Sequence, residues 1–229
     1  MLHPDTTPST AAIADAALRL GIAVRPGPVG LRPVLPGVTY SGPAKPVTHL
    51  GSVDVILETI DAAPRGSVLV VDNGGRTDEA CVGDLIVLEA SMAGLTGAVI
   101  WGLHRDTAQL REIGLPLHSL GAFSFGPRRV PVGGRAMSVA VVDGAPVTAD
   151  DYVAGDDDGV LFFVAQRKVE LFETAWQIQH TEVAQAEKMR GGVSLRQQLD
   201  FDGYKARQAS DPDYSLRQHL VERGNSIET

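Results

Sequence analysis

The stretch SVLVVDNGGRTDEACVGDLIVLEASMAGLTGAVIWG, residues 67–102, decides the fold of this chain. Residues 67–72 and 97–102 are short apolar runs of the kind found in buried strands, and glycines lie close to both. Residues 83–94 lie between the two runs and have the length and composition of a helix that opens at Asp84. The order strand, loop, helix, strand predicts neighbouring parallel strands in an α/β sheet.

Charged residues follow these elements where ligands commonly bind. Arg105 and Asp106 come just after the second strand, with twenty residues between Asp84 and Arg105. The carboxyl ends of parallel strands and the start of the intervening helix meet at one edge of the sheet. Two carboxylates and one guanidinium are therefore expected close together. These are the charges needed for metal-assisted chemistry on a 2-oxo acid.

The N-terminal part of the chain predicts a helix and then an extended crossing. Residues 10–20 place apolar side chains on one face, with Thr10 as a candidate cap and Gly21 as the end. Residues 25–46 hold six prolines and predict an extended, turn-rich segment rather than a domain boundary. Residues 52–62 have helical spacing and lead into the first strand.

The second half of the chain predicts another sheet layer and a long helix. Strands are expected near 136–142 and at 159–164, after a short helical turn at 107–113. Residues 168–190 predict a helix that stops at the Gly191-Gly192 pair. The side chains expected on its buried side are Val169, Phe172, Ala175, Trp176, Gln179 and Val183. The polar tail at 193–229 has isolated hydrophobes, which indicates packing on this subunit or on a neighbour.

Length and composition restrict the class of protein. The chain has 229 residues with 44% hydrophobic content, enough for one main globular domain. Acidic residues outnumber basic ones by 28 to 20, giving a net charge of −8 with the signs interspersed. This argues against nucleic acid or an anionic membrane as the main partner. The single cysteine, the absence of a recognisable signal segment and the lack of a long apolar run predict a cytoplasmic protein.

The Asp-X20-Arg-Asp pattern, with Gly83 before it and GLTGAVI leading into the pair, resembles the class II pyruvate aldolases that cleave 4-hydroxy-4-methyl-2-oxoglutarate. These enzymes belong to the RraA-like family, named after the regulator of ribonuclease E activity. Segments 10–21, 36–44, 156–163 and 194–199 also resemble the family. The regulators share its fold but lack the Asp-X20-Arg-Asp set, so the pattern favours the enzyme branch. Trp101 departs from the small acidic or polar residue of many relatives.

The resemblance implies a fold, an assembly and a reaction. The expected fold is a swivelling-type layered α/β/β/α sandwich, a single domain over residues 1–192 with a helical C-terminal extension at 193–229. The expected assembly is a homotrimer or hexamer whose site is completed across a subunit boundary. An acid from a neighbour's C-terminal region, with Glu222 and Glu228 as possibilities, would contribute. The expected reaction is retro-aldol cleavage to pyruvate, with oxaloacetate decarboxylation as a side activity.

The residues themselves favour a metal route for this chemistry. A Schiff base needs a desolvated lysine, whereas the four lysines lie in polar sequence or beside a proline. Asp106 alone could hold Mg²⁺ or Mn²⁺, because such ions use one or two carboxylates and keep several waters. Arg105 offers a planar donor fork for an oxo acid or its enolate. The main chain of Gly83, Asp84, Leu85 and Ile86 would cradle the substrate carboxylate at the helix start.

Asp84 would also orient a water and assist proton transfer. Each of these residues has a plainer interpretation. Asp84 could be a helix cap, and Arg105–Asp106 a surface ion pair or turn. His104 should point away from Arg105, since alternate residues of an extended segment face opposite sides. Cys81 fits a small buried hydrophobe, Trp101 a half-buried lining residue, and the acidic run 156–159 a turn before a strand rather than a calcium loop.

Three functional hypotheses remain open from the sequence. The first is a divalent-metal-dependent lyase acting on a small 2-oxo acid. The second is a non-catalytic protein-binding regulator of the ribonuclease E inhibitor type, for which no metal dependence is expected. The third is a recruited lyase or hydratase that uses the same metal site on another oxo acid, supported only by Trp101 and the altered loop around it. The loop at 73–76 resembles a phosphate loop only loosely, which weakens a nucleotide-binding or methyltransferase interpretation.

Overall fold

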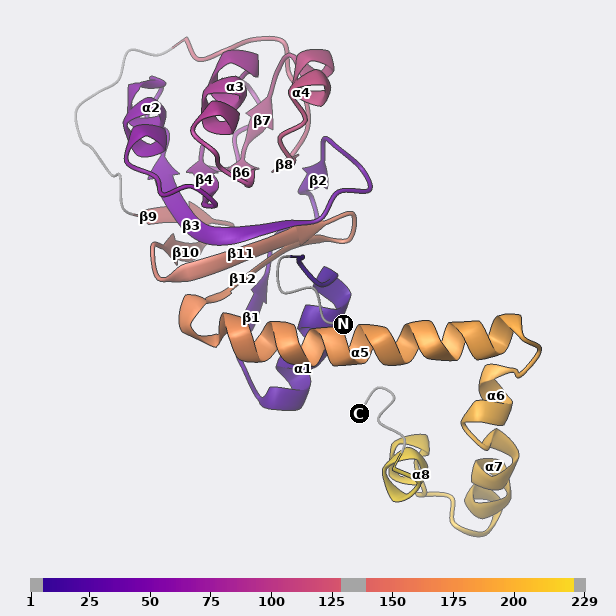
Figure 1. The fold of residues 1–229 in the computed structure, drawn as a ribbon. Coiled ribbons are helices and arrows are strands. Elements are labelled where there is room, and N and C mark those ends of the chain that lie inside the picture. Colours follow the sequence, from indigo (N-terminus) through magenta and orange to yellow (C-terminus); the bar gives the residue numbers. More distant parts are fainter. Residues whose placement is uncertain (1–5, 129–138, 225–229) are drawn as a thin grey trace.

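A computed structural model describes residues 6–128 and 139–224 of the protein, and its elements stack in four layers (Figure 1). An eight-stranded sheet has the order β1-β12-β11-β3-β4-β6-β8-β2. Its strands are β1 (Val24–Pro26), β2 (Arg32–Pro33), β3 (Tyr40–Thr48), β4 (Val68–Asp72), β6 (Gly97–Trp101), β8 (Leu117–Ser119), β11 (Asp151–Asp156) and β12 (Gly159–Val164). The predicted strands at 67–72, 97–102 and 159–164 are confirmed.

Strand β3 joins the two halves of this sheet. Its first residues pair antiparallel with β11, and residues 44–48 pair parallel with β4. This change of partner explains how a strand between two others can contain Pro43 and Pro46, because a proline lacks the N–H needed for a ladder on both sides. The proline-rich segment is thus extended, as predicted, and residues 40–46 of it belong to the long strand β3.

Helices cover the parallel half of the sheet on one outer face. They are α2 (Asp54–Asp61), α3 (Asp84–Met92) and α4 (Thr107–Ile113). A hydrophobic cluster between these helices and the sheet includes Ile56, Ile60, Leu69, Ile100 and Leu110, all 2% exposed or less. Burial of this kind stabilises a fold by roughly 25 cal/mol per Å² of apolar surface. The predicted helix start at Asp84 is confirmed by this layer.

Two further helices cover the antiparallel half on the opposite face. They are α1 (Thr10–Leu20) and α5 (Lys168–Arg190), which follows a short 3₁₀ turn, η1 (Ala165–Arg167). A second hydrophobic cluster packs these helices against the sheet and includes Ile13, Phe163 and Leu171. A third cluster fills the space between the two halves of the sheet and includes Val70, Val99 and Phe162. The hairpin of β9 (Val139–Val142) and β10 (Ala145–Thr148) lies beside β3. The α/β/β/α sandwich is therefore confirmed.

Two local predictions about the helices are wrong. The cap of α1 is Ser9, whose hydroxyl accepts the Ala12 amide, while the Thr10 hydroxyl donates to Asp156 at 2.6 Å. On α5, the predicted inner residues Val169 and Val183 are 63% and 50% exposed. The residues of α5 that are buried are Leu171, Phe172, Ala175 and Ile178. The short turn at Asp157–Asp158 between β11 and β12 confirms the turn interpretation of the acidic run.

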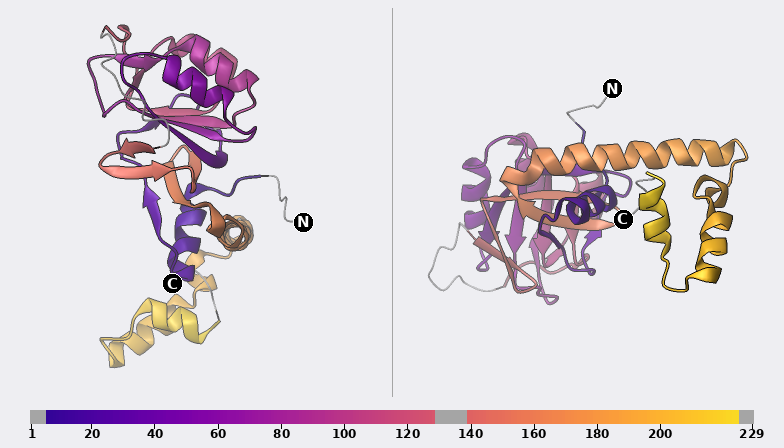
Figure 2. Two further views of the ribbon diagram at one scale, coloured as in Figure 1. Left: turned by 90° about the vertical axis from the view of Figure 1, so that its left-hand side faces the viewer. Right: turned by 90° about the horizontal axis from the view of Figure 1, so that it is seen from below.

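The C-terminal helices lie to one side of the layered body (Figures 1 and 2). They are α6 (Leu195–Gln198), α7 (Phe201–Ser210) and α8 (Leu216–Glu222), and they fold back from the far end of α5. Tyr214 and Leu220 are buried there, and Tyr204 lies within 6.2 Å of the Tyr214 ring centroid. The tail thus has a small cluster of its own, which the sequence did not predict. No helix among the described residues is long and apolar enough to cross a membrane.

Candidate active site

A short two-stranded sheet brings the predicted site residues together. Strand β5 (Ala80–Val82) pairs parallel with β7 (Leu103–His104), and the Arg105 amide donates to the Val82 carbonyl at 3.0 Å. Gly83-Asp84 and Arg105-Asp106 therefore leave two adjacent strands at the same end. This small sheet was not predicted, because each strand is only two or three residues long. The predicted proximity of the two loops is nevertheless confirmed.

Asp106 has a constrained backbone and a carboxylate that contacts both loops. Its φ of 62° lies in the left-handed region, which Asp tolerates better than most residues. Atom Oδ2 lies 3.3 Å from the Arg105 Nε and 3.3 Å from the Asp84 amide nitrogen. Arg105 and Asp106 thus form the ion pair that the plainer interpretation proposed, but the pair lies against the start of α3.

Gly83 allows this close approach. A Cβ built on Gly83 would lie 2.5 Å from the Asp106 Oδ2 and 3.1 Å from the Arg105 Nε. The φ of Gly83 is −127°, which any residue adopts, so the glycine is needed for space rather than for backbone freedom. Gly126 has the same role on the other side, where a Cβ would meet the Arg105 Nη1 at 2.8 Å. Two glycines therefore leave room for the guanidinium.

The start of α3 binds carboxylates already within the protein. The Asp84 amide faces Asp106, and the Leu85 amide donates to the Asp84 Oδ1 at 2.8 Å. The first bond of the helix runs from the Val87 amide to the Gly83 carbonyl. Asp84 is the first residue of the helix, and the cap position is occupied by Gly83. The Asp84 side chain therefore resembles a cap only in its bond with the Leu85 amide. A substrate carboxylate would replace these internal partners at the amides.

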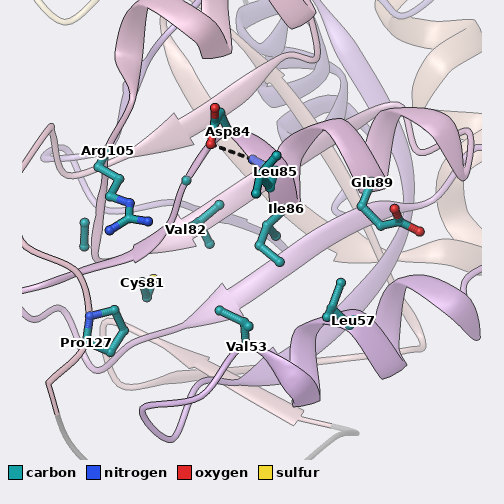
Figure 3. A pocket seen from close by; sticks show the side chains of 12 residues that line it. Val53, Leu57, Cys81, Val82, Asp84, Leu85, Ile86, Glu89, Arg105 and Pro127 are labelled. Carbon is teal, nitrogen blue, oxygen red and sulfur yellow. Dashed lines mark hydrogen bonds between the residues drawn. The ribbon is translucent and has the colours of Figure 1, made fainter.

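A pocket of about 410 Å³ opens over these residues (Figure 3). All five predicted substrate-binding residues line it, namely Gly83, Asp84, Leu85, Ile86 and Arg105. Asp106 lines an adjoining pocket of about 300 Å³, with Thr107 and residues 122–124, and Arg105 lines both. The guanidinium therefore lies between a space beside Asp106 and a larger, mainly apolar space.

Sequence reasoning missed part of the wall of the larger pocket. Val53 and Leu57 come from α2, Glu89 from the second turn of α3 and Pro127 from the loop after β8. Val53 and Leu57 are 38% and 41% exposed. Helical spacing marks such residues as one face of a helix but does not tell which surface they reach. No signal in the sequence distinguishes them from ordinary half-buried residues.

Two residues near the pocket, His104 and Cys81, have structural roles. His104 bonds the Ser119 Oγ through Nδ1 at 2.6 Å and the Thr107 Oγ1 through Nε2 at 2.9 Å, so it points away from the pocket, as predicted. Burial, reinforced by the charge of Arg111, lowers the pKa of His104. Burial raises the pKa of the Cys81 thiol to about 12. The predicted role of Cys81 as a small buried side chain is therefore confirmed.

Trp101 is partly buried, as predicted, but does not line the pocket around Arg105. Its ring lies against Gly75, where an added Cβ would come within 2.9 Å. Glu222 accepts bonds from the Arg207 Nη1 at 2.6 Å and the Tyr214 hydroxyl at 2.9 Å, both within the C-terminal helices. Glu228 lies outside the described residues. Among residues 6–128 and 139–224 of one chain, no C-terminal acid lines the pocket.

The donor set suits a loosely held divalent cation. Within residues 6–128 and 139–224, no group of three or more His, Cys, Asp and Glu side chains is arranged to hold a metal. The Asp106 side chain is 34% exposed, and its recorded contacts all involve Oδ2. Its Oδ1 can therefore be a ligand. One carboxylate with several waters is a common arrangement for Mg²⁺, so Asp106 fits such an ion.

Comparisons with known proteins agree with this geometry. The family model RraA-like (Aldolase/RraA) matches residues 10–162. The chain belongs to this family. A protein of Halorhodospira halophila (strain DSM 244 / SL1), named "Putative 4-hydroxy-4-methyl-2-oxoglutarate aldolase", is 33% identical over 147 residues, covering 62% of this chain and 87% of that protein. The resemblance to the family and its aldolases is thus confirmed.

Two further matches extend over more of the chain. Protein DlpA of Legionella pneumophila subsp. pneumophila is 25% identical over 212 residues, which cover 86% of this chain but only 34% of DlpA. An uncharacterized protein from Pseudomonas syringae pv. tomato str. DC3000 has a crystal structure with a TM-score of 0.71 and 29% identity. That match covers 83% of this chain and 92% of the other. RraA-like relatives named as aldolases support a lyase.

Proposed function

We propose that this member of the RraA-like family is a divalent-metal-dependent lyase that cleaves 4-hydroxy-2-oxo acids to pyruvate. One observation carries the proposal. The Arg105 guanidinium, the Asp106 carboxylate and the start of α3 come together at the rim of a pocket of about 410 Å³. This set provides a cation, a metal ligand and backbone donors for an oxo acid.

The chemistry requires proton movement and charge stabilisation at fixed atoms. The substrate loses the proton of its 4-hydroxyl group, the C3–C4 bond breaks, and C4 leaves as a carbonyl compound. The electron pair of that bond stays on C3 of the pyruvate enolate, and a proton added at C3 gives pyruvate. An Mg²⁺ or Mn²⁺ ion held by Asp106 would polarise the ketone and stabilise the enolate charge.

The protein residues have separate tasks in this scheme. The fork of Arg105 binds the oxo-acid head and stabilises developing charge on its oxygen. The amides of residues 83–86 hold the carboxylate. The Asp84 carboxylate, released from the Leu85 amide when substrate binds, orients a water that takes the hydroxyl proton and supplies the proton to C3. The same enolate forms when oxaloacetate loses CO₂, which makes decarboxylation an expected side activity.

We also propose that the chain acts as a homotrimer or hexamer, and that it consists of one domain at 1–192 and a C-terminal extension at 193–229. Exposed apolar side chains gather on α2 and α3 beside the pocket. They are Val53, Leu57, Leu85, Leu88 and Met92, the last of them 71% exposed. Clusters of exposed apolar side chains commonly mark protein contacts, so a neighbouring subunit is expected to cover this rim.

A metal titration of pyruvate release tests the proposal. The measurement uses 4-hydroxy-4-methyl-2-oxoglutarate, 4-hydroxy-2-oxopentanoate and oxaloacetate, with Mg²⁺ or Mn²⁺ and with a chelator. We expect release only with metal, and a loss of about 100-fold or more in the Asp106→Ala variant. Asp61→Ala, an exposed aspartate at the end of α2, is the matched control and should keep full activity. Equal rates with metal and with chelator would contradict the proposal.

The same titration separates the other two hypotheses. A protein-binding regulator would release no pyruvate from any of these compounds under either condition. A lyase or hydratase recruited for another oxo acid would bind pyruvate in a metal-dependent manner without cleaving the substrates. Trp101, which with the loop around it is the support for that third hypothesis, packs on Gly75 outside the pocket. The arrangement of Arg105 and Asp106 therefore favours the aldolase.

A further inference from the structure

The charges around the pocket distinguish its two ends. Arg105 is the only Lys or Arg lining the pocket within the part of the chain that the structure describes. Two acids, Asp84 and Glu89, also line it, and the remaining wall is apolar or glycine. Figure 3 shows Arg105 and Glu89 on opposite sides, with Val82 and Ile86 between them. One end thus suits an anion, and the other carries a negative charge.

Helix α3 runs along the pocket from the end near Arg105 to the end near Glu89. Glu89 is five residues after Asp84, which places it about 7.5 Å along the helix from its start. The oxo-acid head, held by Arg105 and the start of α3, occupies the first end. The group on C4 must then reach toward Val53, Leu57 and Glu89. A second carboxylate there would lose water against apolar side chains and face the charge of Glu89, with no Lys or Arg at that end among the described lining residues.

We infer that the preferred substrate has an uncharged, apolar group on C4, so that cleavage yields pyruvate and an apolar aldehyde. This inference rests on the proposed function and names the substrate class of that site. It differs from the diacid in the name of the Halorhodospira relative, because 4-hydroxy-4-methyl-2-oxoglutarate carries a second carboxylate at the distal end. Glu89 and Leu57 are then specificity-determining residues.

A matched pair of substrates tests the inference on the intact protein. 4-Hydroxy-2-oxopentanoate and 4-hydroxy-2-oxoglutarate differ only in having a methyl group or a carboxylate at the distal position. We expect kcat/KM for metal-dependent pyruvate release to be on the order of 100-fold higher for the methyl compound. 4-Hydroxy-2-oxohexanoate, with one more methylene, should gain roughly tenfold again. An equal or higher kcat/KM for the diacid would overturn the inference.

Substitution of Glu89 provides a second measurement. Glu89 is exposed on α3, and arginine is an equally good helix former, so Glu89→Arg should fold normally. The new cation should raise kcat/KM for the diacid by about tenfold relative to that for the methyl compound. Glu187→Arg on exposed α5 makes the same change in net charge and should shift neither value. An identical response of both substrates to Glu89→Arg would overturn the role of Glu89.

The outcomes also separate this inference from the proposed function. No metal-dependent pyruvate release from any of the substrates would mean that the proposed function itself is wrong. Metal-dependent release with a preference for the diacid would leave the lyase in place and remove only the apolar substrate class. A preference for the methyl compound that Glu89→Arg reduces would support both.

Discussion

Helix α5 is buried along its first half and exposed along its second. We call the protein up to Ile178 the body, and the rest of α5 with α6, α7 and α8 the arm. Leu171, Phe172, Ala175 and Ile178 pack under the antiparallel strands. Val183 and Met189, farther along the same helix, are 50% and 46% exposed. The body is held by three hydrophobic clusters, whereas the arm is held by a few aromatic contacts, ion pairs and helix caps.

The comparison teaches where function should be sought. Every described residue that lines the candidate pocket lies between Val53 and Pro127, within the body. The match to the RraA-like family model ends at residue 162, before α5 begins. The arm therefore lies outside the part of the chain that the family model matches. Its proposed role is contact with a neighbouring subunit.

The largest expected difference lies within α5 itself. Leu171→Ala should lower the free energy of unfolding by about 2–5 kcal/mol, because it leaves a cavity in the buried cluster. Val183 lies five residues after Ile178, the last buried residue of α5, and is exposed. Val183→Ala should therefore change the free energy of unfolding by less than about 0.5 kcal/mol. Urea unfolding of both variants measures this difference. Similar decreases in the free energy of unfolding for the two variants would mean that the second half of α5 is also buried against another part of the protein or a neighbouring subunit.

Two glycine substitutions compare the site with the arm. Gly83→Ala places a methyl group against the Asp106 carboxylate and should reduce pyruvate release by about 100-fold, because a shift of about 1 Å in a catalytic group has such an effect. Gly203→Ala in α7 places a methyl group against Asp200, within the arm, and should leave release unchanged. Steady-state kinetics with saturating metal gives both values. Full activity in Gly83→Ala would remove the close approach from the mechanism.

The body should also lose stability in acid through its buried histidines. Burial lowers the pKa of both His104 and His118 in the folded protein. Their unfolded pKa is about 6.5, so below that pH the unfolded chain binds protons that the native state does not. Stability is therefore full above about pH 6.5 and falls as the pH decreases. Thermal unfolding at a series of pH values should show this, with a weaker dependence in His118→Gln.

The smallest expected effect is confined to the arm. Ser215 and Gln218 form a capping box at the start of α8, in which the Gln218 amide donates to the Ser215 Oγ at 3.2 Å. Ser215→Ala should weaken this helix by about 1 kcal/mol. Hydrogen exchange should become faster in α8, while the amides of β4 and β6 keep their protection. Faster exchange in the sheet as well would show that body and arm unfold together.

The sequence by itself determined an α/β fold, the strands on either side of α3 and the meeting of Asp84 with Arg105 and Asp106, while the α/β/β/α sandwich was implied by the family resemblance. Apolar runs and helical spacing indicate these elements because buried strands and amphipathic helices repeat with different periods. The parallel order then brings the loops to one sheet edge. The family pattern singled out the same residues.

Only the tertiary structure decided the surroundings of those residues. The change of partners along β3, the short β5–β7 pair and the approach of Gly83 to Asp106 depend on contacts between distant segments. The apolar wall at the start of α2 and the position of Glu89 across the pocket from Arg105 follow from how helices pack on the sheet. Local periodicity places a side chain on one face of its own element, but packing determines what that face meets.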